Sequence, residues 1–111
     1  MDSILTSVKK MLMIAEDDKT FDADIMMHIN SVFLTLNQIG VGPAEGFYIE
    51  NKSDTWEDFL GDATNLEAVK SYMFLKVRLL FDPPLSSSVI EASNRMIAEF
   101  EWRLRLAVDA M

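Results

Sequence analysis

Residues 76–84 read KVRLLFDPP and set a demanding condition on the fold, because a helix that is apolar on nearly every side ends there at two prolines. We predict this helix over residues 66–81. Its main stripe comprises Leu66, Val69, Met73, Val77 and Leu80. The stripe widens past half of the circumference through Tyr72, Phe74, Leu79 and Phe81. Pro83 and Pro84 end the helix, since proline donates no backbone hydrogen bond and disfavours helix in the preceding residue.

A helix with such a wide apolar surface needs cover from several partners. The chain has 111 residues, of which 50% are hydrophobic and 25% charged. That composition fits one domain, spanning residues 1–111, which buries roughly 65% of its unfolded surface. So short a chain has few elements to offer as cover. We therefore expect part of the cover for residues 66–81 to come from other copies of the chain.

Apolar spacing of three to four residues predicts three further helices. The first covers residues 4–15 after Asp2 or Ser3 as cap, and the second covers residues 23–38 between an Asp22 cap and Gly40. The last covers residues 89–107. The pairs Thr64 with Glu67 and Ser88 with Glu91 are spaced as capping boxes. The predicted fold is an all-α, four-helix bundle-like subunit. Its expected core positions outside residues 66–81 are Ile4, Val8, Met11, Leu12, Ala15, Ile25, Ile29, Val32, Phe33, Leu36, Val89, Met96, Ile97, Phe100, Leu104 and Ala107.

The connection at residues 40–63 holds all four glycines and is longer than a simple bundle loop. Its large apolar residues argue against disorder. We expect a short strand over residues 47–50 and one helical turn over residues 55–60, closed by Gly61. Acidic residues alternate with the aromatic ones, which suggests a docking arm for a protein partner. The apolar set is Phe47, Tyr48, Ile49, Trp56, Phe59 and Leu60.

Charge and composition exclude several classes of function. The formal charge of −8 argues against a sequence-independent grip on nucleic acid phosphates. There is no cysteine for a disulfide or a thiolate metal site. We also expect no membrane span, since no apolar run approaches ~18 residues, and no secretion signal, since the order of segments that a signal needs is missing at the N-terminus.

The search for catalytic or metal-binding residues yields none that we select. His28, the only histidine, lies among apolar helix positions without a placed partner, so a partly buried structural role is preferred. The acidic residues from Glu16 to Asp24 lack the central glycine and terminal glutamate of a calcium loop and suit a solvated turn. We therefore expect no catalytic residue, no metal site, no cofactor and no enzymatic activity.

The order of these segments resembles the head-tail connector, or adaptor, proteins of long-tailed bacteriophages. The resemblance runs from about Ile4 to Leu106. Its most specific pieces are residues 30–33 with 40–42, residues 56–61 (WEDFLG) and residues 77–84. The resemblance implies a homo-oligomeric ring below the portal protein, dodecameric in the virion, which continues the DNA channel and docks a downstream neck, head-completion or tail protein. It also implies assembly in the bacterial host cytoplasm and no catalytic residues.

Under that resemblance, the apolar excess and the loop become candidate contacts with other subunits or partners. A ring subunit needs two different apolar flanks, and a net negative wall lets DNA slide without binding. Trp102 fits either rim packing or an intersubunit contact, and the arginines of the last helix suit an acidic portal surface. The candidate interface residues are Phe47, Tyr48, Trp56, Phe59, Leu60, Phe74, Leu79, Phe81, Trp102, Arg103 and Arg105.

Two other classes of function remain open from the residues alone. A small acidic helical regulator that binds one protein partner would show the same charge and apolar excess, but it would form a dimer or a one-to-one complex. An enzyme built on paired carboxylates would need two such groups on an apolar face beside a basic partner, and this sequence has no such arrangement. A mass measurement separates the connector from the regulator.

Overall fold

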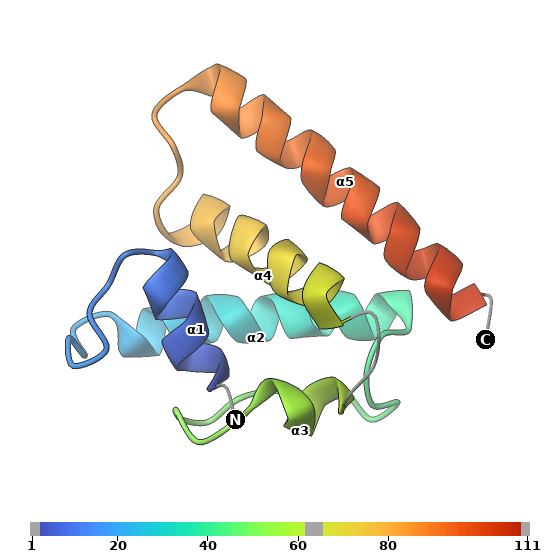
Figure 1. The fold of residues 1–111 in the computed structure, drawn as a ribbon, viewed down its shortest axis with the longest axis horizontal. Coiled ribbons are helices and arrows are strands. Elements are labelled where there is room, and N and C mark those ends of the chain that lie inside the picture. The colour runs from blue at the N-terminus through green and yellow to red at the C-terminus, as the bar shows by residue number, and fades with distance from the viewer. Residues whose placement is uncertain (1–2, 62–65, 110–111) are drawn as a thin grey trace.

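The computed structural model describes residues 3–61 and 66–109, which form an all-α fold as predicted. The helices are α1 (Ile4–Met11), α2 (Asp22–Ile39), α3 (Trp56–Leu60), α4 (Leu66–Phe81) and α5 (Ser87–Asp109). Figure 1 shows α4 between α2 and α5, with α1 crossing α2 and α3 below it. The molecule is a flat slab with extents of 40 × 36 × 19 Å. The capping box predicted from Thr64 begins outside the described residues.

Helix α4 lies at the centre of the slab and contacts α1, α2 and α5. These three neighbours explain how one chain covers most of a helix that is apolar nearly all round. Val69, Met73 and Val77 are fully buried, and Tyr72 joins them. Leu80, predicted on the same stripe, is instead exposed. The helix ends at Phe81, before Pro83 and Pro84, as predicted.

Helix α2 confirms its predicted stripe, and Gly40 ends it in the left-handed conformation that favours glycine. The predicted cap was wrong, because Phe21 occupies the N-cap position and no side chain caps the helix. Asp22 lies inside the helix, and its Oδ1 is 2.8 Å from the ammonium of Lys9. That buried oxygen accepts no hydrogen bond from any described residue, so the ammonium is its electrostatic partner.

Lys9 also explains why the first helix is shorter than predicted. Its buried ammonium donates hydrogen bonds to the carbonyls of Glu16 (3.0 Å) and Asp18 (2.7 Å). The chain must fold back to bring those carbonyls to Lys9, so α1 ends at Met11 and Met13 takes a positive φ of 63°. As a result Met11 and Ala15, which we expected in the core, are exposed.

The described part of the connection, residues 40–61, is folded against its own subunit. The predicted strand at residues 47–50 is absent; the described part of the connection has only an isolated bridge between Ser3 and Thr55. The side chain of Asn30 takes the place of a partner strand, accepting from the N–H of Ile49 (2.7 Å) and donating to its carbonyl (3.1 Å). The predicted helical turn is present as α3, which Thr55 and Asp58 open with a capping box.

Helix α5 begins two residues earlier than expected, at Ser87. The N–H of Val89 donates to the hydroxyl of Ser86, so Ser86 takes the capping role predicted for Ser88. Ile97 and Leu104 are buried, but Val89 and Met96, which we expected in the core, are about half exposed. The first half of α5 stands clear of α1 and α2 (Figure 1), so these side chains lack cover from those helices.

Candidate functional site

Two apolar surfaces are the most prominent candidates for function. Among the described residues no group of three histidine, cysteine or acidic residues is placed to hold a metal ion. His28 is partly buried, as expected, and its ring lies edge-on to Phe81 with centroids 6.4 Å apart. No described helix is long and apolar enough to cross a membrane.

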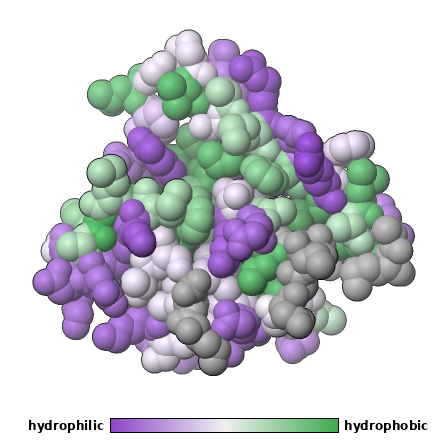
Figure 2. All heavy atoms as spheres, in the orientation of Figure 1, coloured by the Kyte–Doolittle hydropathy of each residue, from purple (hydrophilic) through white to green (hydrophobic). Residues whose placement is uncertain are grey.

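The first surface is a hollow of about 170 Å³ between α1, α4 and the start of α5, which we call the groove. Its apolar lining comes from all three helices and from the proline turn. These residues are Met11, Leu12, Phe74, Leu79, Pro84 and Val89. Figure 2 shows hydrophobic surface on this side of the molecule, between α5 and the helices below it. The groove exists because α5 diverges from α1 after the chain turns at the two prolines.

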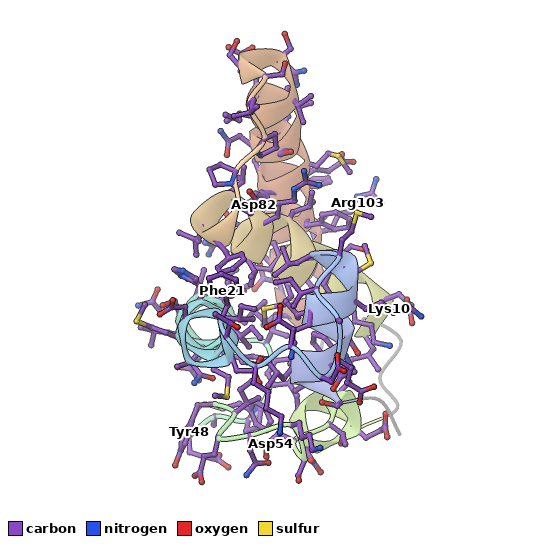
Figure 3. The ribbon with its side chains drawn as sticks, turned by 90° about the vertical axis from the view of Figure 1, so that its left-hand side faces the viewer. Lys10, Phe21, Tyr48, Asp54, Asp82 and Arg103 are labelled. Carbon is purple, nitrogen blue, oxygen red and sulfur yellow. The ribbon has the colours of Figure 1, made fainter. Side chains whose placement is uncertain are left out.

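The second surface, which we call the α2 ridge, consists of Met27, Leu34 and Tyr48. Their side chains are 60%, 61% and 64% exposed. Met27 and Leu34 are two helical turns apart on the side of α2 opposite its buried stripe, and Leu34 and Tyr48 border one shallow hollow. In Figure 3, α2 and Tyr48 lie on one side of the slab, and α1 with Lys10 lies on the other.

The two surfaces carry charges of opposite sign. Arg78 lines the groove, and Lys10 projects from the same side of the slab (Figure 3). Asp24 borders the shallow hollow beside Met27, and Glu45 borders the one beside Leu34. None of these four side chains forms an ion pair with another described residue. Arg78 is therefore the charged residue of the groove lining, and Asp24 and Glu45 are acidic residues beside the ridge.

A family model described as phage connector protein matches residues 4–111, which is nearly the whole chain. The chain belongs to the phage connector protein family. No curated protein and no solved structure gives a significant match to it. Membership assigns the chain a structural connector role in a bacteriophage, with phage portal and tail proteins as the partners of the family. It favours that role over the single-partner regulator.

The aromatic residues of the loop support the connector's own core. Trp56 and Phe59 are buried, and the Trp56 indole N–H donates to the hydroxyl of Ser7 (3.3 Å). Phe33, Phe47 and Phe59 form a ring cluster with centroids 4.7 to 5.2 Å apart. Gly42 lies against this cluster so closely that an added Cβ would meet the Phe59 ring at 2.4 Å. Trp56 and Phe59 are thus unavailable to a neighbour in this structure, whereas Tyr48 is exposed.

The remaining candidate interface residues of the connector form one partly buried group and one exposed group on α5. Phe74 and Leu79 are partly buried and line the groove, and Phe81 packs edge-on against Phe21 at 5.5 Å. Leu60 is partly buried against the core. On α5, Trp102, Arg103 and Arg105 are exposed. Arg103 is not free, since its guanidinium lies 2.7 Å from the carboxylate of Glu99 on the same helix.

Sequence reasoning missed both Met27 and Leu34 as surface residues. Met27 and Leu34 are seven residues apart on the polar side of the second helix, and this spacing could have predicted that they form one exposed apolar face. Sequence reasoning also missed the charges around the two surfaces, because Lys10, Arg78, Asp24 and Glu45 come together with the apolar residues only in the folded connector.

Proposed function

We propose that this connector forms a ring below the portal protein, extends the DNA channel at the head-tail junction, and offers a docking face to the next neck or tail component. The observation that carries the proposal is that the apolar excess of the chain leaves two separate uncovered surfaces, the groove and the α2 ridge. A subunit in a ring contacts two neighbours through two different surfaces, whereas a two-fold dimer uses one surface twice.

The charge of the connector fits a conduit for DNA. A formal charge of −8 gives weak repulsion of phosphates, and a strongly basic wall would instead bind DNA by counterion release. The exposed basic residues of α5 do not alternate with a row of aromatic side chains that could stack bases. DNA therefore passes through the channel by confinement, without specific binding.

The exposed side of the C-terminal half of α5 is the proposed site of contact with the portal or tail. Trp102 is exposed there together with Arg103 and Arg105. An exposed tryptophan beside arginines is typical of the residues that dominate protein interfaces. None of these three residues lines the groove or belongs to the α2 ridge.

Native mass spectrometry of the connector with and without the portal protein of the same phage tests the proposal. We expect a complex that holds several copies of the connector for each portal ring. A single copy bound to a single partner chain, or no binding to the portal, would favour a different function.

A further inference from the structure

We propose that the groove of one connector receives the α2 ridge of the next copy, so that Met27, Leu34 and Tyr48 of one subunit pack on α1, α4 and α5 of its neighbour. This inference rests on the proposed ring and specifies which surfaces join its subunits. The occupant of the groove is thus a second copy of this chain.

The positions of the two surfaces suit a head-to-tail contact. The groove is lined in part by α1, and the ridge is formed by α2 and Tyr48. In Figure 3, α1 lies on one side of the slab and α2 with Tyr48 lies on the other. The slab is 19 Å thick and its broad faces measure 40 by 36 Å. Such a face exceeds the roughly 800 Å² that each partner contributes to a standard interface. Copies stacked broad face to broad face repeat the same contact, and the stack closes into a ring when the rotations between successive slabs add up to one full turn without a rise along the axis.

The shapes and polarity of the two surfaces also match. The groove is concave and lined mainly by apolar side chains, with Leu79 and Val89 on opposite walls from α4 and α5. The ridge offers three large side chains that are each more than half exposed. Placing these side chains in the groove removes apolar surface from water on both partners. It also covers Phe74 and Leu79 of α4, which line the groove.

Opposite charges favour this pairing over a contact between two grooves or two ridges. Lys10 and Arg78 on the groove side have no ion-pair partner among the described residues, and neither do Asp24 and Glu45 beside the ridge. A groove facing a groove would bring like charges together, as would a ridge facing a ridge. The head-to-tail contact brings the basic side chains to the acidic ones, so charge sets the direction in which subunits add.

Two variants that each disable one surface test the inference. Val89→Glu places a charge in the groove at a half-exposed site in the first turn of α5, where an acidic residue is compatible with the helix. Leu34→Glu places a charge on the ridge. The matched control is Leu106→Glu, since Leu106 is 49% exposed against 48% for Val89 and lines neither surface. Oligomer size is measured by sedimentation and native mass spectrometry at the highest soluble concentration, with circular dichroism to confirm that each variant is folded.

We expect the wild-type chain and Leu106→Glu to form oligomers, and each surface variant alone to lose roughly tenfold or more in association. An equimolar mixture of Val89→Glu and Leu34→Glu should form a dimer and nothing larger, because one intact groove meets one intact ridge. Oligomers of either variant alone, or a mixture that stays monomeric, would overturn the pairing. So would a wild-type chain that is monomeric at every concentration.

A second measurement does not depend on variants. A zero-length carbodiimide reagent joins an amine to a carboxylate in contact with it, so a mixture of ¹⁵N-labelled and unlabelled connector should give cross-links from Lys10 of one copy to Asp24 or Glu45 of another. Intersubunit cross-links confined to other surfaces would contradict the inference. Native mass spectrometry with the portal protein tests ring formation separately. It can show several copies of the connector on the portal even if the groove and the α2 ridge do not pair.

Discussion

The hydroxyl of Tyr72 donates a hydrogen bond of 2.7 Å to Oε2 of Glu101, and this bond fastens α5 to α4. The ring of Tyr72 is buried, while the carboxylate of Glu101 is partly exposed. Burial, and then the bond to the carboxylate, raises the pKa of Tyr72 far above its ordinary value. The bond lies at the part of α5 that contacts the body, beyond the half that stands clear of α1.

Replacing Tyr72 by phenylalanine should lower the free energy of unfolding by about 1 kcal/mol at neutral pH, because the bond to a partly exposed carboxylate is lost and water can solvate Glu101 in its place.

The raised pKa of Tyr72 also predicts that the stability of the connector depends on pH. A neutral Tyr72 is favoured in the folded state, so its contribution is complete below the ordinary tyrosine pKa of about 10 and is lost as the pH rises above that value. Urea unfolding measured from pH 7 upward should show the wild type losing stability more steeply than Tyr72→Phe above about pH 10. Parallel curves would exclude this role for the bond.

Replacing Lys9 by methionine should destabilise the connector by about 3 kcal/mol. The change leaves the Oδ1 of Asp22 buried without its cation and removes the donor from the carbonyls of Glu16 and Asp18. Lys10→Met is the matched control, since that lysine is exposed, and its effect should be below about 0.5 kcal/mol. Equal effects of the two changes in thermal or urea unfolding would contradict the role given to Lys9.

Replacing Trp56 by alanine should cost about 3 to 5 kcal/mol, because a fully buried indole leaves a cavity and the hydroxyl of Ser7 loses its donor. Tyr48→Ala removes an exposed ring from the same loop and should leave stability nearly unchanged while weakening self-association. Measurements of stability and self-association on the two variants therefore distinguish a residue that stabilises the fold of the loop from a residue that contacts a neighbouring subunit. A stable, normally folded Trp56→Ala protein would show that the loop does not depend on this anchor.

The connector should show no appreciable affinity for duplex DNA at about 0.15 M salt, where charge interactions beyond roughly 8 Å are screened. The reason is its formal charge of −8 without a concentrated basic face. Replacing Arg103 and Arg105 with glutamine should weaken attachment to the portal and leave DNA behaviour unchanged. Tight DNA binding whose affinity falls steeply with rising salt concentration would contradict the proposal that DNA passes through the channel without binding.

The sequence predicted the helices because apolar periodicity and glycine or proline stops are local signals. The buried stripe of α2, the end of α4 before Pro83 and the helical turn at α3 are confirmed. The short strand was wrong because Asn30, nearly twenty residues away, satisfies the backbone of Ile49. Local sequence could not show that pairing.

The surfaces were less predictable than the helices, because spacing alone does not tell a covered apolar residue from an uncovered one. Met96 has core spacing but lies on the half of α5 that diverges from the body. The sequence allows Trp56 to anchor the loop either on its own subunit or on a neighbour, and the structure places it in its own subunit. Of the predicted interface residues, the structure leaves Tyr48, Trp102, Arg103 and Arg105 exposed and Phe74 and Leu79 accessible from the groove.

Electron cryo-microscopy of the neck of the phage that carries this connector can show whether it forms the proposed ring at the head-tail junction. We expect a ring of copies of this fold directly below the portal, surrounding the DNA channel. Density for this fold at another place in the particle, or a single copy bound to one side of the neck, would contradict it.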